Sequence, residues 1–265
     1  MSCFAKAKKI VVKVGTSTLT HGTGLINIRR LERFVKTLAD LKNSGRDIIL
    51  VSSGAIGVGV GKLGLSQRPQ DTPSKQAAAA VGQCELMYLY DKLFSEYNHA
   101  VAQVLLTRDV VELPQRKENC VNTFRRLLEM GVIPVVNEND TVAVEEIEFG
   151  DNDTLSAMVA VLAEADALVI MSDIDGLYDG DPRKNPEAKL IPEVDEVTGE
   201  TLALAGGVGS SRGTGGMVTK LHAAQIACPA GVEMAIVNGS DPEILYRLLD
   251  GEPVGTCFHG KERKA

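Results

Sequence analysis

Short apolar runs alternate along the chain with longer stretches whose composition or spacing favours helices. The short runs are bounded by glycine, proline, asparagine and aspartate, which is typical of buried strands. The longer stretches have helical periodicity or, as in the alanine-rich region, high helix propensity. We therefore expect strands over 9–14, 47–51, 101–106, 132–136, 167–171 and 234–237, and helices over 31–43, 74–95, 119–130, 155–162, 220–229 and 241–249.

Strands separated by helices in this way predict an α/β fold. Its sheet should be mainly parallel and covered by helices on both faces, which makes a three-layer sandwich. Three segments break the pattern: 141–149 alternates like an exposed hairpin or flap, 175–190 has the composition of a loop, and 206–216 is rich in glycine and serine. We see no internal repeat and no clear linker, so a single domain over 1–265 is expected.

The charge balance and the apolar pattern limit the partners that the protein could have. Its 35 Asp and Glu against 28 Lys and Arg give a formal net charge of −7, aromatics make up 4%, and tryptophan is absent. These features argue against a nucleic-acid partner. No apolar run approaches the roughly 20 residues of a membrane span, and the N-terminus leads into a short strand rather than a signal-peptide core. We expect a cytoplasmic protein without a membrane partner.

The cysteines and histidines give no sign of a disulfide frame or a metal site. Five cysteines are scattered, odd in number and free of C-x-x-C spacing, so we interpret them as small hydrophobic residues in a reducing compartment. The four histidines show neither metal-ligand spacing nor a pairing that suggests a catalytic triad. We expect no metal ion held by the protein's own side chains.

Carboxylates and amides gather at two predicted element ends. Asn137–Asp140 directly follows a buried apolar run, and Gly150–Asp153 opens a helix. Polar groups at this density are costly to bury without partners. Helix capping would account for Asp151 or Asp153, but not for both clusters. Because open α/β sheets bind ligands at the carboxyl ends of their strands, the clusters predict a site for a polar, cationic ligand.

Three turns rich in glycine and small residues, at 13–17, 52–59 and 213–220, could bind an anion. Lys13 ends the first strand, and Lys220 lies one turn into a helix. Ammonium groups, free backbone N–H groups and helix N-termini bind phosphates. Taken singly, a surface lysine, a packing contact or a linker would explain each turn. Together with the acidic clusters they predict a polyphosphate site.

Two common phosphate and nucleophile motifs do not apply to these turns. The turn after the first strand is neither a Walker P-loop nor a G-x-G-x-x-G turn. The turn after the second strand lacks a histidine placed to activate a serine. P-loop and serine-hydrolase chemistry are therefore not indicated.

Six segments together resemble the amino-acid kinase family: 12–17, 52–56, 137–140, 150–153, 172–173 and 213–217. The resemblance covers about residues 9–258, and the pairing of Asn137–Asp140 with Gly150–Asp153 is similar to the branch that phosphorylates L-glutamate in the first step of proline synthesis. It implies an acceptor-binding part over about 1–160 and a nucleotide-binding part over about 161–265. Many members carry a C-terminal PUA domain, which we do not expect here because the sequence ends at Ala265.

The resemblance also implies partners and residue roles. L-glutamate and ATP with Mg²⁺ would be bound, and a homo-oligomer and feedback inhibition by proline are usual in the family. Lys13 and Lys220 would flank the transferred phosphoryl group, and Asp153 would position them. The implied acceptor-binding residues are Ser53, Gly54, Asn137, Asp140, Asp151 and Asn152; the implied ATP-binding residues are Lys13, Gly15, Thr16, Ser172, Asp173, Thr214, Gly215, Gly216, Met217, Val218, Thr219 and Lys220.

Two alternatives stay open at this point. The acceptor could be N-acetylglutamate, aspartate, uridylate or carbamate. Acetylglutamate has no free ammonium and does not need the Asp140 cluster, while uridylate would call for further basic residues. A non-catalytic amino-acid-sensing protein on the same scaffold is the second alternative, which the presence of Lys13, Lys220 and Asp153 disfavours.

Overall fold

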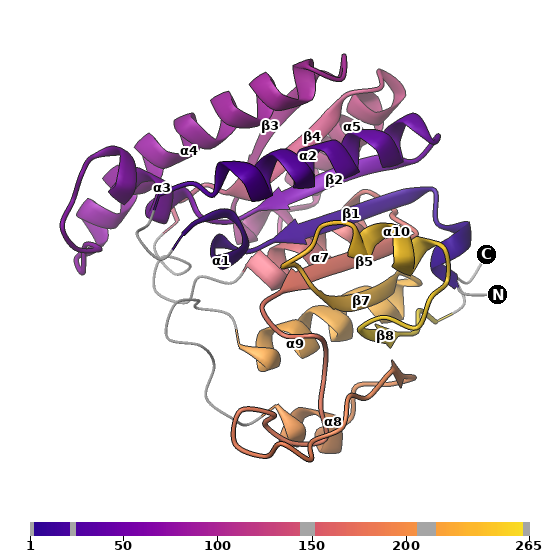
Figure 1. Cartoon of the computed structure of the whole chain (residues 1–265). Helices are drawn as coiled ribbons and strands as arrows, with labels where there is room; N and C mark the ends of the chain where they lie inside the picture. Colours follow the sequence, from indigo (N-terminus) through magenta and orange to yellow (C-terminus); the bar gives the residue numbers. More distant parts are fainter. Residues whose placement is uncertain (1–2, 22–24, 144–151, 206–215, 262–265) are drawn as a thin grey trace.

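The computed structural model describes residues 3–21, 25–143, 152–205 and 216–261. In this part the chain forms one eight-stranded sheet in the order β3-β4-β2-β1-β5-β7-β8-β6 (Figure 1). The pairings are parallel except for β7 with β8, which are antiparallel. The strands are β1 Lys9–Val14, β2 Asp47–Ser52, β3 Val101–Leu106, β4 Ile133–Glu138, β5 Ala167–Ser172, β6 Glu193–Val194, β7 Glu233–Asn238 and β8 Thr256–Phe258.

Helices cover both faces of this sheet, so the predicted three-layer α/β architecture is confirmed (Figure 1). One hydrophobic core lies between the sheet and α2, α3, α4 and α10, and a second lies between the sheet and α5, α7 and α9. The helices are α1 Thr16–Leu19, α2 Ile28–Asn43, α3 Ala55–Lys62, α4 Thr72–Ser95, α5 Pro114–Glu129, α7 Asn152–Leu162, α8 Gly199–Leu204, α9 Met217–Ala227 and α10 Ile244–Leu249, with 3₁₀ turns η1 Cys3–Lys6, η2 Arg108–Val110 and η3 Cys228–Ala230.

Alternation within the strands divides side chains between the two cores. In β1, Val12 and Val14 belong to the core under α2 and α4, whereas Val11 belongs to the core under α7 and α9. Successive side chains of a strand point to opposite faces. Lys13 therefore lies on the same face as Val11, toward α7 and α9. Its position in the strand thus decides which helices its side chain can contact.

Helix starts follow local capping signals where these exist. The Asn27 side chain accepts a hydrogen bond from the Arg30 N–H at the start of α2, and the Asp71 side chain accepts one from the Ser74 N–H at the start of α4. Such side chains satisfy N–H groups that the first turn leaves without partners. These caps explain why both helices begin earlier than their apolar spacing alone predicts.

Other predicted boundaries were wrong. α5 begins at Pro114 and α9 at Met217, before the predicted residues 119 and 220, and in neither does a side chain cap the first turn. α9 ends at Ala227 because Pro229 cannot continue the helix, and a 3₁₀ turn follows. α10 begins at Ile244, because Asp241 accepts a hydrogen bond from the Glu243 N–H in a local turn instead.

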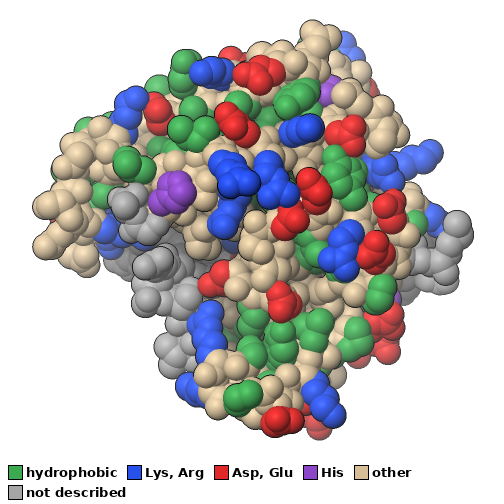
Figure 2. Space-filling view, in the orientation of Figure 1, with side chains coloured by type: hydrophobic (Ala, Val, Ile, Leu, Met, Phe, Trp, Pro, Cys, Tyr) green, Lys and Arg blue, Asp and Glu red, His purple; other side chains and the backbone are tan. Residues whose placement is uncertain are grey.

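The segments predicted to be irregular can be checked only in part. Residues 175–190 are turns and bends with one isolated bridge, between Tyr178 and Leu190, so the predicted loop is confirmed. Most of 141–149 and 206–216 lies outside the described residues. The described helices include none long and apolar enough to cross a membrane. Figure 2 shows Lys and Arg side chains intermixed with Asp and Glu over the face that it draws.

Candidate active site

Residues from the ends of several parallel strands come together at one edge of the sheet. Val14 is in register with Ser52 of β2 and with Met171 of β5, so β1, β2 and β5 end at the same level. The chain leaves these strands at Gly15, Ser53 and Asp173. The first turns of α7 and α9, which carry Asp153 and Lys220, also lie at this edge, which is where parallel sheets place their ligands.

The carboxylate of Asp153, in the first turn of α7, lies between two lysines. Lys13 Nζ is 2.7 Å from Asp153 Oδ1, and Lys220 Nζ is 3.0 Å from Asp153 Oδ2. The three side chains are nearly buried, with relative exposures of 11% for Lys13, 7% for Lys220 and 1% for Asp153. Charges this deep are stable only when they are paired and hydrogen-bonded. The sequence prediction that these three residues act together is consistent with this geometry.

A hydroxyl from α9 also contacts this carboxylate. Thr219 Oγ1 donates a hydrogen bond of 2.7 Å to Asp153 Oδ2, and it also lies 2.8 Å from the Gly216 carbonyl. Burial by itself would raise the pKa of Asp153, but the ammonium groups of Lys13 and Lys220 and the hydrogen bonds from Lys13 and Thr219 hold it well below its usual range. Asp153 is therefore ionised at neutral pH and unsuited to act as a proton acceptor.

The amide side chains of the two polar clusters form a second group beside the first. Asn152 Nδ2 donates to Ser53 Oγ at 2.8 Å and to Asn137 Oδ1 at 2.9 Å. Asn137 Nδ2 donates in turn to Gln83 Oε1 of α4 at 2.9 Å. Three predicted residues, Ser53, Asn137 and Asn152, are thus joined in one hydrogen-bonded chain. Because Asn152 immediately precedes Asp153, this chain is attached directly to the lysine site.

The turns after β1 and β2 lie against each other at Gly54. This residue has φ +105°, in the left-handed region that favours glycine, and a Cβ there would come within 3.6 Å of Thr16. The helix α3 starts at the next residue, and no side chain caps it. Its first N–H groups are therefore presented beside Thr16 and Gly15, an arrangement suited to an anion.

Asp140 lies at the edge of a cavity of about 370 Å³. Gln83 and Asp140 both line this cavity, together with apolar side chains of α4 and β3 such as Met87 and Leu105. Burial raises the pKa of Asp140 to about 6, although the positive charge of Arg68 acts in the opposite direction. A cationic partner would stabilise the ionised form of this carboxylate.

The remaining predicted residues fall into three groups. Ser172 is buried at the end of β5 and donates to Asp173 Oδ1 at 3.4 Å, while Asp173 is exposed and 3.6 Å from Arg183. Gly216 precedes α9, and Met217 and Val218 lie in its first turn, Val218 being 38% exposed. None of these is shown in contact with Asp153. Asp151, Thr214 and Gly215 lie outside the described residues.

Two side chains of α4 that belong to the surroundings of the site were missed by the sequence analysis. Gln83 ends the amide chain, and the Tyr90 hydroxyl lies 2.8 Å from Ser52 Oγ, directly before Ser53. Burial raises the pKa of Tyr90, so it stays protonated. Gln83 and Tyr90 are seven residues apart in a helix that was predicted from its alanine content. This spacing places them on one face of the helix, and it was the signal in the sequence that could have found them.

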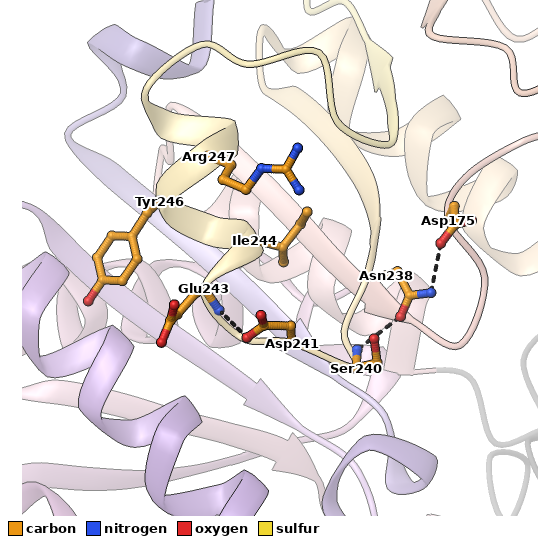
Figure 3. Close-up of a pocket in the computed structure, with 8 residues that line it drawn as sticks. All are labelled: Asp175, Asn238, Ser240, Asp241, Glu243, Ile244, Tyr246 and Arg247. Atoms are coloured by element: carbon orange, nitrogen blue, oxygen red, sulfur yellow. Dashed lines mark hydrogen bonds between the residues drawn. The ribbon is translucent and has the colours of Figure 1, made fainter.

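A second cavity, of about 440 Å³, lies at the ends of β7 and α10 (Figure 3). Its lining includes the carboxylates Asp175, Asp241 and Glu243, and Asn238 Nδ2 donates to Asp175 Oδ1 at 2.7 Å. Three carboxylates make a poor environment for a polyphosphate. None of the predicted site residues lines this cavity, so the lysine site remains the better candidate.

The sequence is similar to curated proteins over almost its whole length. It is 56% identical over 260 residues to glutamate 5-kinase of Clostridium perfringens, covering 97% of each chain. It is 53% identical to glutamate 5-kinase of Listeria innocua, covering 97% of this chain and 95% of the relative. It is 57% identical to glutamate 5-kinase of Carboxydothermus hydrogenoformans, where it covers 97% of this chain and 69% of the relative.

Solved structures and a family-level comparison agree with this result. UMP kinase from Bacillus anthracis matches with a TM-score of 0.65 at 17% identity, covering 96% of each chain, and an isopentenyl phosphate kinase matches with 0.65 at 18%, covering 94% and 99%. At these identities the likeness shows the fold alone. The sequence profile of the amino acid kinase family matches residues 8–238. The chain therefore belongs to the amino acid kinase family.

Proposed function

We propose that the protein transfers the γ-phosphoryl group of ATP to the γ-carboxylate of L-glutamate, giving L-glutamyl 5-phosphate and ADP. Relatives that carry the name glutamate 5-kinase support this acceptor, at 52–57% identity over 97% of the chain. The Lys13–Asp153–Lys220 arrangement is the observation that carries the proposal, because it supplies the charge that such a transfer needs.

The chemical difficulty lies in bringing two anions together. The acceptor carboxylate has an ordinary pKa of about 4.3 and is ionised at neutral pH, so no general base is required. An oxygen of this carboxylate forms a bond to the γ-phosphorus, and the bond from that phosphorus to the β–γ bridging oxygen breaks, leaving ADP. Two ammonium groups around one carboxylate leave one positive charge in excess, and Lys13 and Lys220 would direct it at the transferring group.

Asp153 acts in this proposal as the residue that positions both lysines. A long, flexible lysine side chain has about 2 kcal/mol of rotamer entropy to lose on fixation. The contacts at 2.7 and 3.0 Å hold both ammonium groups before the substrates arrive. Preorganised charge of this kind costs no rearrangement at the moment of reaction.

ATP would enter as its Mg²⁺ complex, which we treat as the substrate. Both oxygens of Asp153 already face ammonium groups. The described residues include no group of three or more His, Cys, Asp or Glu that could hold a metal ion. The ion would therefore be held mainly by the phosphate oxygens, which is usual for Mg²⁺ bound with nucleotides. Gly15, the start of α9 and Ser172 are the proposed nucleotide contacts.

Glutamate recognition is assigned to Ser53, Asp140 and Asn152. Asp140 would pair with the α-ammonium, and the Ser53 hydroxyl would donate to a carboxylate oxygen. On this assignment the part up to about residue 160 binds the acceptor, and the part from about 161 binds the nucleotide. The alternatives N-acetylglutamate, UMP and isopentenyl phosphate carry no ammonium, so they would leave the Asp140 carboxylate without a cationic partner.

Release of ADP from Mg-ATP, measured with a panel of acceptors, tests this proposal. L-glutamate, L-aspartate, N-acetyl-L-glutamate and UMP are compared at equal concentrations. The proposal predicts turnover with L-glutamate at least about tenfold faster than with the others. Turnover that is faster with another acceptor would overturn the assignment of the substrate while leaving the phosphotransfer site in place. Turnover with none of them would favour a non-catalytic protein.

A further inference from the structure

The amide chain from Ser53 to Gln83 has a direction. Its donors point away from α7. Asn152, in α7, donates to Ser53 and to Asn137, and Asn137 donates in turn to Gln83. An amide has one accepting oxygen and one donating nitrogen, so the role of one member dictates the role of the next. The role of Gln83, at one end of the chain, therefore sets the role of each amide as far as Asn152.

The same four positions would also allow the opposite direction. Gln83 would then donate to Asn137, Asn137 would donate to Asn152, and the Ser53 hydroxyl would donate to Asn152. The two arrangements present different atoms to a ligand. In the observed one, the Ser53 oxygen accepts from Asn152, so its proton can be directed at an acceptor, and Asn152 Oδ1 carries lone pairs. In the opposite one, the Ser53 proton is used internally and Asn152 shows N–H groups.

We propose that Gln83 is a positioning residue for the acceptor site: by accepting from Asn137 it selects the direction of the amide chain that Ser53 and Asn152 need to recognise a zwitterionic amino acid. The inference rests on the proposed function. The ammonium group requires an oxygen acceptor, which Asn152 Oδ1 supplies, and the carboxylate requires a donor, which Ser53 supplies. Gln83 acts through Asn137 and has no direct contact with the reacting atoms.

The backbone around Gln83 is held in place by a close helix crossing. A Cβ on Gly82 would lie 1.8 Å from the Ala55 carbonyl oxygen, and a Cβ on Gly59 would lie 1.8 Å from the Ala78 carbonyl oxygen. α4 therefore packs against α3 backbone to backbone, directly beside Gln83. Because α3 begins immediately after Ser53 and Gly54, this crossing fixes the distance between the two ends of the amide chain.

Three variants test the inference through steady-state kinetics with L-glutamate and Mg-ATP at pH 7.5. Gln83→Glu has only accepting oxygens when ionised, so it keeps the observed direction. Gln83→Met has similar length and neither accepts nor donates as an amide does, so the direction is no longer selected. Gln115→Met is the matched control, because Gln115 is an exposed glutamine of α5 that is outside the amide chain and does not line the cavity of Asp140. Thermal unfolding checks that each variant is folded.

The expected result separates recognition from general damage. Gln83→Met should raise the glutamate KM at least about tenfold, with the ATP KM changed less than threefold. Gln83→Glu and Gln115→Met should stay within about threefold of the parent protein in both constants. A purely structural role of Gln83 would not explain why Gln83→Glu, which can only accept, keeps the glutamate KM of the parent protein while Gln83→Met does not.

Two results would overturn the inference while the proposed function stands. One is a Gln83→Met protein with an unchanged glutamate KM, and the other is a Gln83→Glu protein as impaired as Gln83→Met. A parent protein that is folded but shows no turnover with L-glutamate would be a different failure. It would contradict the proposed function itself, and the role of Gln83 in glutamate recognition would fall with it.

Discussion

Lys13 and Lys220 bind opposite oxygens of one buried carboxylate, with Nζ–O distances of 2.7 and 3.0 Å to Asp153. One lysine comes from the first strand of the chain and the other from a helix near its end. They meet because the Lys13 side chain points to the face of the sheet that α9 covers, where α7 supplies Asp153. Without the carboxylate between them, the two ammonium groups would repel each other.

Replacing Lys220 should affect catalysis more than binding. Lys220→Met removes an ammonium group proposed to stabilise charge on the transferring phosphoryl group, so kcat should fall by about 10²–10³-fold. The glutamate KM should change less than about threefold, since the proposed acceptor contacts lie elsewhere. Lys261→Met is the control, because Lys261 is an exposed lysine paired with Glu196 at the surface. A fall of similar size in both variants would contradict the role given to Lys220.

Asp153→Asn should lower both activity and stability. The amide keeps the shape of the side chain but removes the charge between the two lysines, and breaking a buried ion pair in this way costs about 3–5 kcal/mol. Urea unfolding at pH 7 measures this difference. An unfolding free energy equal to that of the parent protein would show that the carboxylate does not hold the lysines.

The pH dependence of that difference has a defined sign. The pKa of Asp153 is lower in the folded protein than in the unfolded chain, where it is about 3.9, so its contribution to stability is fully present above that value. It is lost progressively as pH falls below about 4. The gap between parent and Asp153→Asn should therefore stay constant from pH 7 to about 5 and narrow in more acidic solution. A gap that narrows above pH 5 would contradict a lowered pKa.

Asp140 should give the acceptor step a pH dependence near pH 6. Burial raises the pKa of Asp140 to about 6, and only its ionised form attracts the α-ammonium of the acceptor. The value of kcat/KM for glutamate, which reports groups of the free enzyme, should fall about tenfold for each pH unit below 6. Asp140→Asn should have a low kcat/KM and a flat profile in this range. An unchanged acidic limb in Asp140→Asn would assign it to another group.

Gly82→Ala should destabilise the fold through the crossing of α3 and α4. The added Cβ would lie 1.8 Å from the Ala55 carbonyl oxygen, a contact that only a shift of the helices can relieve. Such overpacking costs about 1–3 kcal/mol. Gly199→Ala is the matched control, because a Cβ there meets nothing within 4 Å. Equal unfolding free energies for the two variants would contradict the packing argument.

The parallel core of the fold was predictable from local sequence, and so was the choice of Lys13 and Lys220 as candidate residues. The strand 101–106 was predicted with its observed bounds, because an apolar run between turn residues is a local property. Lys13 and Lys220 were found because each adjoins a glycine-rich turn. Their meeting at Asp153 was implied only by family resemblance, since spacing along the chain does not specify which helices flank a strand.

Features that depend on tertiary contacts were not predictable. The strands β6 and β8 have two and three residues, too few to show a period, and the antiparallel pairing of β8 with β7 followed from no local signal. Gln83 lies in a helix predicted from its alanine content, and its seven-residue spacing from Tyr90 indicates only that the two share a helical face. Its role depends on Asn137, which folding brings within hydrogen-bonding distance.

Trapping of the product with hydroxylamine tests the central claim most directly. The protein is incubated with Mg-ATP, L-glutamate and hydroxylamine, and the hydroxamate is identified by mass spectrometry in the parent protein and in Lys220→Met. The account predicts ATP-dependent formation of the γ-hydroxamate of glutamate, reduced at least about 10²-fold in the variant. ADP release without any γ-hydroxamate, or equal yields from both proteins, would contradict it.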